Sequence, residues 1–204
     1  LTWFFQGGGD PVEFFVQRWN EVRDTQLKYA YRESWEKLLE KGQGLLELFI
    51  QNEAPRLGRI VASEKPFEIS ITSLGLPLVG VIDLLAEMEG VLTVVDFKTA
   101  SAAYADHEVI LSDQLTAYHL AEPDALQSAF CVLVKTKEPR IDWHFAQRDA
   151  ERLTEFLAKV EHVAIGIADG VFYRRPGQWC AWCDYLPICM GDKQRAQECL
   201  MCVA

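Results

Sequence analysis

The chain has 204 residues, half of them apolar and a quarter charged, a composition that is typical of one compact globular domain. Its 30 acidic residues outnumber its 20 basic residues, so the net charge of −10 excludes a protein whose whole surface binds nucleic acid. No apolar run is long enough to span a membrane and the start does not resemble a signal peptide, so we expect a cytoplasmic protein without membrane contact.

A local basic strip remains compatible with nucleic-acid binding at this net charge. Four groups of basic residues are candidates for such a strip, and each is equally typical of solvated surface. They are Arg56 with Arg59, Lys135 with Lys137 and Arg140, Arg174 with Arg175, and Lys193 with Arg195.

Two helices are expected before the first strand. Asp10-Pro11 is a typical helix start, with Asp as the N-cap and Pro at the first helical position. Apolar residues at helical spacing predict a second helix over residues 31–51. Alternation over Arg59–Thr72 then predicts a strand with Val61 on one face and Glu64 and Glu68 on the other.

A β-hairpin follows, with strands over Leu78–Leu85 and Val91–Phe97. If Glu89-Gly90 is its two-residue loop, Asp83 lies directly opposite Asp96. Since side chains alternate along a strand, Asp96 and Lys98 share a face.

Two facing carboxylates in an apolar hairpin repel each other unless a cation lies between them. Carboxylate oxygens suit Mg²⁺ or Mn²⁺, which retain waters and leave room for a phosphate oxygen. Lys98 would then orient water or neutralise charge at phosphorus. The alternative is a surface hairpin in which Asp96 and Lys98 form a structural ion pair.

The elements after the hairpin alternate between helix and strand. A small polar loop is expected over Ala100–His107, followed by a helix capped by Ser112 on which Gln114 and Tyr118 share a face. Further strands are predicted over Ser128–Thr136, which holds a core Cys131, and over Arg140–Phe145, followed by a helix over Asp149–Ala168. This order predicts an α/β fold.

Cysteines cluster near the C-terminus. Cys180 and Cys183 form a C-x2-C pair and Cys189 follows six residues later, which is nearly a complete tetrahedral thiolate set. Thiolates select zinc or an iron-sulfur cluster. A tetrahedral set needs a fourth ligand, and Cys199 and Cys202 are candidates for it within this sequence.

The order G-x-x-D (Gly80, Asp83), D-x-K-T (Asp96 to Thr99) and Q-x-x-x-Y (Gln114, Tyr118), followed by the cysteine cluster, resembles the PD-(D/E)XK nuclease superfamily. The similarity is to its RecB-like exonuclease branch with a C-terminal iron-sulfur cluster, which includes AddB-type and CRISPR-associated members. It implies a restriction-endonuclease-like core, in which helices flank a central mixed β-sheet, with a small cysteine-rich C-terminal lobe. The corresponding division is a helical part over residues 1–58, a nuclease core over 59–176 and a metal-binding lobe over 177–204, all in one compact domain.

The resemblance also implies roles for site residues. Asp83, Asp96, Glu64 and the Phe97 carbonyl would hold Mg²⁺ or Mn²⁺, with Glu68 as a substitute for Glu64. Lys98 would activate water, and Gln114 and Tyr118 would assist.

For the cysteines, the resemblance implies a [4Fe-4S] cluster on Cys180, Cys183 and Cys189, with zinc as the alternative. The family's fourth cysteine and its metal-binding histidine lie upstream, yet here no cysteine precedes Cys131 and no histidine precedes His107. Because the chain does not begin with Met, we expect a segment before Leu1 to carry the cysteine, or Cys199 or Cys202 to complete the set. The histidine is expected in a segment missing near Gly7 to Gly9, unless the protein manages without it.

These features predict a metal-dependent DNA exonuclease, acting on single-stranded ends in recombination, repair, phage replication or CRISPR-related DNA processing. A helicase or a recombination or CRISPR protein is the expected partner. The alternative is a catalytically weak nucleic-acid-binding subunit stabilised by a sulfur-bound metal, which the missing histidine and the acidic charge favour.

Overall fold

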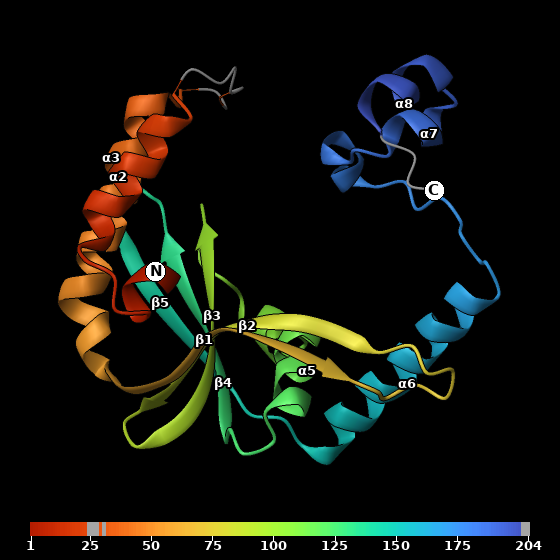
Figure 1. Cartoon of the computed structure of the whole chain (residues 1–204), viewed down its shortest axis with the longest axis horizontal. Helices are drawn as coiled ribbons and strands as arrows, with labels where there is room; N and C mark the ends of the chain where they lie inside the picture. The colour runs from red at the N-terminus through yellow and green to blue at the C-terminus, as the bar shows by residue number, and fades with distance from the viewer. Residues whose placement is uncertain (24–28, 30–31, 201–204) are drawn as a thin grey trace. The chain divides into compact units, whose positions relative to one another are not determined.

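The computed structural model describes residues 1–23, 29 and 32–200 (Figure 1). The chain divides into two compact units, Leu1–Glu161 and His162–Ala204, which are described separately. The predicted start of the second helix at Tyr31 and the candidate ligand Cys202 lie outside the described residues. No helix among the described residues has both the length and the apolar composition needed to cross a membrane.

The first unit is built on a five-stranded mixed sheet in the order β1-β2-β3-β4-β5 (Figure 1). All neighbours pair antiparallel except β3 and β4, which are parallel. The strands are β1 (Leu57–Ile69), β2 (Leu78–Met88), β3 (Val91–Ala100), β4 (Gln127–Val134) and β5 (Arg140–Ala146). The crossover between β3 and β4 contains α4 (Asp106–Ile110) and α5 (Asp113–Ala121).

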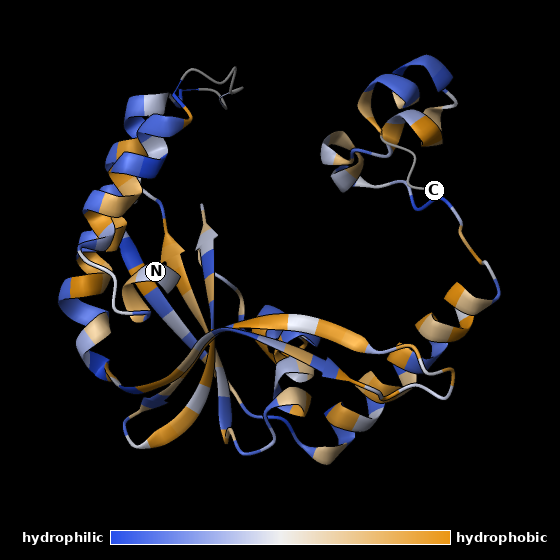
Figure 2. Cartoon of the chain, viewed as in Figure 1, coloured by the Kyte–Doolittle hydropathy of each residue, from blue (hydrophilic) through white to orange (hydrophobic). Residues whose placement is uncertain are grey.

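Helices cover the sheet on both sides. The helices that precede it are α1 (Thr2–Phe5), α2 (Pro11–Glu21) and α3 (Trp35–Leu48), which continues through a π turn (Phe49–Glu53) and a 3₁₀ turn (Ala54–Arg56) into β1. Figure 2 shows α2 and α3 banded in polar and apolar colours, as expected of helices that bury one face. α6 (Ala150–Ala168) follows β5. The α/β fold with a mixed sheet flanked by helices is therefore confirmed.

Two apolar clusters fill the first unit, one on each face of the sheet. Phe49, Leu84 and Val95 lie in the cluster beneath α3, and Val94, Leu115 and Val132 lie in the cluster beneath α5. All six side chains are fully buried. Since Val94 and Val95 belong to opposite clusters, β3 is buried on both faces and its side chains have fixed directions.

The hairpin prediction is confirmed in loop and register. Glu89 and Gly90 form the two-residue loop, with φ of 52° and 83°, and the pairs run from Met88 with Val91 to Leu84 with Val95. Positive φ at both positions is the geometry of a type I′ turn, which matches the twist of the flanking strands. The Asp10 cap of α2 and the Ser112 cap of α5 are also as predicted.

Two local expectations were wrong. The strand expected over Arg59–Thr72 ends at Ile69, and Val61 is 42% exposed because register shifts between Leu57 and Ala62 break the strict alternation. The loop expected over Ala100–His107 is shorter, because β3 extends to Ala100 and α4 begins at Asp106.

The second unit contains a 3₁₀ turn (Gln178–Trp182), α7 (Leu186–Met190) and α8 (Lys193–Cys199). Among its described residues only Ala164 and Pro187 are buried. Five of its aromatic side chains are between 64% and 85% exposed: Phe172, Tyr173, Trp179, Trp182 and Tyr185. This unit therefore has very little hydrophobic core of its own.

Candidate active site

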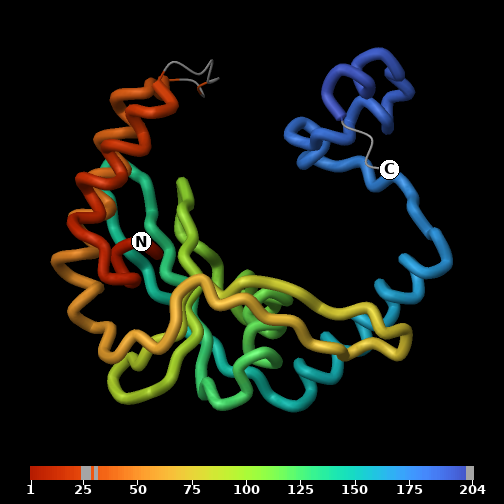
Figure 3. Tube along the Cα trace, in the orientation of Figure 1, coloured from red at the N-terminus to blue at the C-terminus, as the bar shows by residue number. Residues whose placement is uncertain are grey.

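The candidate site lies where β2 separates from β3. Their ladder ends at Leu84 and Val95, while the pairing of β2 with β1 continues to Leu78 (Figure 3). Ile82 and Leu84 pack in opposite clusters, so the side chains of β2 change direction at Asp83. Beyond this point the end of β3 that carries Asp96, Phe97 and Lys98 has no partner in the β2 ladder.

Asp83 bridges the two strands at this point. Its Oδ2 accepts a hydrogen bond of 2.9 Å from the backbone N–H of Phe97. In a continuous ladder a backbone carbonyl of β2 would take that role, so the carboxylate replaces a lost backbone partner. The predicted pairing of Asp83 with Asp96 lies one step beyond the last paired residues of this ladder, Leu84 and Val95.

Asp96 is the most buried charged side chain of the site, with 1% of its surface exposed. Its Oδ1 accepts hydrogen bonds from Gln114 Nε2 at 2.7 Å and from the Tyr118 hydroxyl at 3.3 Å. Lys98 Nζ lies 2.7 Å from Oδ2 and is the one close donor to this oxygen among the described residues. Burial raises the pKa of Asp96 and outweighs the opposing effect of the Lys98 charge.

Lys98 is placed by two groups besides Asp96. Its ammonium donates to Gln114 Oε1 at 2.9 Å and lies 5.4 Å from the centroid of the Phe130 ring. The register aligns Phe130 of β4 with Asp96, which explains why the ring lies beside the ammonium. The side chain is 28% exposed, so the charge reaches solvent.

Gln114 and Tyr118 come from α5 and close the network. Gln114 Nε2 also donates to the Tyr118 oxygen at 2.8 Å, and the Tyr118 hydroxyl lies 2.9 Å from the Val81 carbonyl. Phe67 packs edge-on against the Tyr118 ring. Burial is the largest cause that raises the pKa of Tyr118 to about 12, so the phenol stays protonated at neutral pH.

Glu64 belongs to β1, which pairs with β2 along the edge away from β3. It lies opposite Asp83, between the pairs Ser63 with Leu84 and Lys65 with Ile82. Its φ of 49° is unusual for a residue with a side chain. Its carboxylate accepts a hydrogen bond of 2.6 Å from the Thr2 hydroxyl. Glu68 instead pairs with Val79, four positions further along the strand, which is about 13 Å away at the usual rise of a strand.

The six predicted residues thus lie on β1, β2, β3 and α5, and direct contacts join four of them: Asp96, Lys98, Gln114 and Tyr118. A scan against protein-family models matches residues 9–190 to the PD-(D/E)XK nuclease superfamily. The chain belongs to this superfamily. The separated strands and the Asp83, Asp96 and Lys98 side chains fall within the matched range.

Two solved structures resemble this PD-(D/E)XK chain. A Eubacterium rectale protein provisionally named an exonuclease is 13% identical, with a TM-score of 0.55 over 100% of this chain and 73% of that one. This likeness concerns the fold alone. The protein SSO0001 is 16% identical over 90% of this chain and 97% of that one, and its TM-score of 0.49 supports no argument. The search of curated proteins gave no match.

PD-(D/E)XK nucleases generally use Mg²⁺ or Mn²⁺. Within the described residues, no three His, Cys, Asp or Glu side chains are gathered tightly enough to hold a metal ion. Each of the three carboxylates is instead turned toward a protein donor: Asp83 toward the Phe97 amide, Asp96 toward Lys98 and Gln114, and Glu64 toward Thr2. Asp96 Oδ2 is a buried carboxylate oxygen whose one close donor among the described residues is the Lys98 ammonium, and such an oxygen suits a hard cation.

The predicted cysteine ligands of this PD-(D/E)XK chain lie in the second unit. Cys180 is in the 3₁₀ turn and Cys189 in α7, while Cys183 follows the turn and lines a hollow of about 620 Å³ that Cys199 also lines. The Cys180 thiol accepts a hydrogen bond of 3.3 Å from the Gly177 N–H. All five described cysteines are free thiols, and Cys131 is buried in the sheet, where burial raises the pKa of its thiol.

Sequence reasoning missed Phe130 and Arg148. Phe130 is an apolar strand residue like its neighbours, and its place beside Lys98 follows only from the parallel register of β3 and β4. Arg148 lies between β5 and α6 and is 92% buried, since only 8% of its surface is exposed. A single arginine beside a predicted helix start carries no sequence signal of such burial.

Proposed function

We propose that this protein is a divalent-metal-dependent deoxyribonuclease that degrades DNA from single-stranded ends. One observation carries the proposal: the buried Asp96 carboxylate pairs through Oδ2 with the Lys98 ammonium at 2.7 Å where two strands separate, and that oxygen has no other donor among the described residues. Burying a charge in this way is costly for a purely structural ion pair. Such an arrangement is typical of a site that handles charged ligands.

We infer that Asp83, Asp96 and the Phe97 carbonyl would hold Mg²⁺ or Mn²⁺, with Glu64 as a further ligand. The bound ion would supply charge neutralisation at the phosphate and lower the pKa of a water molecule. In hydrolysis a water oxygen would form a new bond to phosphorus and give up one proton to solvent, while one P–O ester bond breaks and the leaving alkoxide takes up one proton.

Lys98 has two tasks in this proposal. Its ammonium, held between Asp96 and Gln114, orients the attacking water and stabilises the negative charge that develops on the phosphoryl oxygens. Gln114 keeps the ammonium and the Asp96 carboxylate at fixed distances, and Tyr118 anchors Gln114 to β2 through the Val81 carbonyl. These hydrogen bonds reduce the reorganisation that the reaction requires.

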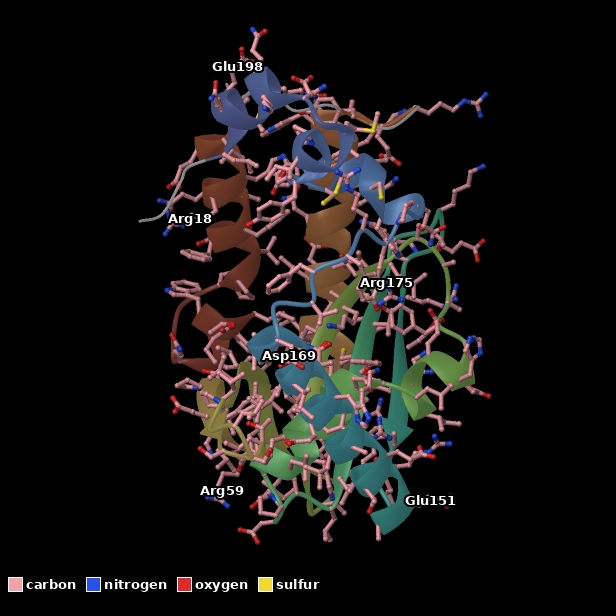
Figure 4. The ribbon with its side chains drawn as sticks, turned by 90° about the vertical axis from the view of Figure 1, so that its right-hand side faces the viewer. Arg18, Arg59, Glu151, Asp169, Arg175 and Glu198 are labelled. Carbon is pink, nitrogen blue, oxygen red and sulfur yellow. The ribbon has the colours of Figure 1, made fainter. Side chains whose placement is uncertain are left out.

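The basic residues that would contact DNA are not equally available. Arg56, Arg59 and Arg140 are each ion-paired, with Glu53, Glu87 and Asp142. Figure 4 shows Arg59 at the surface. Residues 162–204 contain four basic and four acidic side chains, so the net charge of −10 lies entirely on the other 161 residues. Arg174 and Arg175 in the neutral second unit are therefore our preferred DNA contacts.

We further propose that Cys180, Cys183 and Cys189 hold a [4Fe-4S] cluster, with zinc as the alternative and Cys199 as a candidate fourth ligand. The near absence of a core in the second unit supports a sulfur-bound metal, since small units without a core need such a crosslink to fold. A visible spectrum and metal analysis after anaerobic purification test it. A broad band near about 400 nm supports the cluster, whereas a colourless protein that contains zinc supports the alternative.

The nuclease proposal is tested with end-labelled single- and double-stranded DNA in Mg²⁺, Mn²⁺ or EDTA. Cutting that requires the metal and proceeds from single-stranded ends supports the proposal. Binding of DNA without cutting under every metal would favour the second candidate function, a catalytically weak binding subunit. The binding-subunit function is supported by the engagement of all three carboxylates with protein donors.

A further inference from the structure

Arg148 is a buried guanidinium whose hydrogen bonds all go to neutral acceptors. Its Nε donates to the Thr116 hydroxyl at 2.8 Å, and its two Nη atoms donate to the backbone carbonyls of Gln147, Val109 and Ser112 at 3.2, 3.0 and 3.3 Å. Burial lowers the pKa of Arg148, and the nearby Arg152 lowers it further. A buried charge without a carboxylate partner is unfavourable, so its retention calls for an explanation.

These acceptors belong to the turn that joins α4 to α5. The Val109 carbonyl is in the last turn of α4, where carbonyl groups lack helical partners and attract cations. The Ser112 carbonyl belongs to the N-cap of α5 and also accepts from the Thr116 hydroxyl at 2.9 Å. Arg148 therefore fixes both the entry of the chain into α5 and the first turn of that helix.

The bonds of Arg148 and those of the catalytic network lie on opposite sides of α5. Gln114 and Thr116 are two residues apart, which is about 200° around an α-helix. Gln114 and Tyr118 share the side that faces Asp96, while Thr116 faces Arg148. Arg148 thus contacts α5 on the side opposite Asp96, in the same helical turn from which Gln114 bonds to Asp96 and Lys98.

We propose that Arg148 is a positioning residue that sets the position of α5, so that Gln114 holds the Lys98 ammonium and the Asp96 carboxylate in reactive geometry. This proposal rests on the proposed function of the site. It distinguishes Arg148 from a residue that only stabilises the fold, because its effect on the reaction has to pass through Gln114.

A double-mutant cycle tests the proposal. The substitutions are Arg148→Lys, which keeps the charge and loses the planar fork of donors, and Gln114→Ala. Thr116→Val replaces Arg148→Lys if that variant does not fold, since it removes the Nε acceptor without changing the charge. Arg152→Met is the matched control, because this arginine lies in the first turn of α6, is ion-paired at the surface with Glu155 and touches neither α4 nor α5 through a hydrogen bond in the described structure.

We expect Arg148→Lys to lower kcat about tenfold in the wild-type background, with little change in KM, and less than about twofold in the Gln114→Ala background. Its effect on the melting temperature is expected to be the same in both backgrounds. A tenfold loss in both backgrounds would overturn the proposal, because it would show an effect that bypasses Gln114. Arg152→Met is expected to leave kcat unchanged.

A readout without catalysis separates this proposal from the proposed function. The side-chain amide signals of Gln114 in an NMR spectrum are identified by their loss in Gln114→Ala. Arg148→Lys is expected to broaden them or to speed their hydrogen exchange, whereas Arg152→Met is not. If wild type cuts no DNA but the amide signals respond in this way, the nuclease assignment fails and the positioning role stands. Unchanged Gln114 amide signals in Arg148→Lys would contradict the positioning role, regardless of the cutting rate that the variant shows.

Discussion

The carboxylates of the first unit and the thiols of the second are both groups that bind metals, but the protein holds them in very different ways. Asp96 is 1% exposed, lies on a strand buried on both faces, and is bonded to α5. Cys180 and Cys183 lie in and directly after a 3₁₀ turn and Cys189 lies in the short helix α7, in a unit where Ala164 and Pro187 are the only buried residues described. The hydrophobic core assembles the first site, whereas the described part of the second unit provides almost no core to hold its thiols in place.

This comparison predicts that the two sites fail independently. A change in the Asp96 network is expected to alter chemistry with the fold intact. A change at the cysteines is expected to unfold the second unit, whereas the five-stranded sheet of the first unit stays folded. The following experiments test the contrast, from the largest expected effect to the smallest.

Lys98→Met is expected to lower the cutting rate roughly 100- to 1,000-fold, because it removes the charge that stabilises the phosphoryl oxygens and leaves most of the side-chain volume. The measurement is the initial rate on end-labelled DNA together with the DNA affinity. Lys65→Met is the matched control, since Lys65 is also a strand lysine with an ion pair, to Glu122 at the C-cap of α5. Equal rates for the Lys98 variant and wild type would remove Lys98 from the mechanism.

Cys180→Ser combined with Cys183→Ser is expected to open the second unit to limited proteolysis, with cleavage at least about ten times faster within residues 171–200. The melting temperature of the sheet unit is expected to stay the same. Cys131→Ala is the converse control: it leaves a cavity in the sheet and is expected to lower the melting temperature without changing cleavage of the second unit. Loss of both units in the double variant would contradict their independence.

Tyr118→Phe is expected to lower the cutting rate about tenfold and to cost about 1 kcal/mol of stability. The ring would still pack against Phe67, but Gln114 and the Val81 carbonyl would lose their link. Rate measurements and thermal melts of the same samples give both values. If stability falls and the rate does not, Tyr118 serves the fold alone.

Asp96→Asn is expected to raise the melting temperature of the metal-free protein by a few degrees at neutral pH. Because burial raises the folded-state pKa of Asp96 above its unfolded value, the folded protein holds that proton more tightly. The stability contributed by this carboxyl is therefore full below the ordinary Asp range and is lost as the pH rises through the folded-state pKa. Melts from pH 3 to 8 in EDTA test this sign, and a variant that is less stable at pH 7 would reverse it.

The hairpin could be predicted almost completely from the sequence, because the Glu89-Gly90 turn and the alternation of apolar residues fix both loop and register. The helix caps at Asp10 and Ser112 were equally readable, since a single side chain determines each of them. Local patterns were sufficient where the interaction itself is local.

The parts that the sequence did not predict depend on contacts between distant elements. The change of direction of β2 at Asp83 and the positive φ of Glu64 arise where two strands separate, and no neighbouring residue encodes that separation. Phe130 reaches Lys98 only through the parallel pairing of β3 with β4, and Arg148 is buried by α4 and α5, which precede it by some 30 residues or more. Such relations belong to packing and not to spacing in the sequence.

The most direct test of the account compares Asp96→Ala with Asp142→Ala on single-stranded DNA in Mg²⁺. Asp142 is a matched control, since it is also a strand aspartate in an ion pair, with Arg140. The account predicts metal-dependent cutting by wild type and Asp142→Ala, and none by Asp96→Ala, with all three proteins folded. Cutting by Asp96→Ala at the wild-type rate would contradict the central claim that this buried carboxylate is the core of a nuclease site.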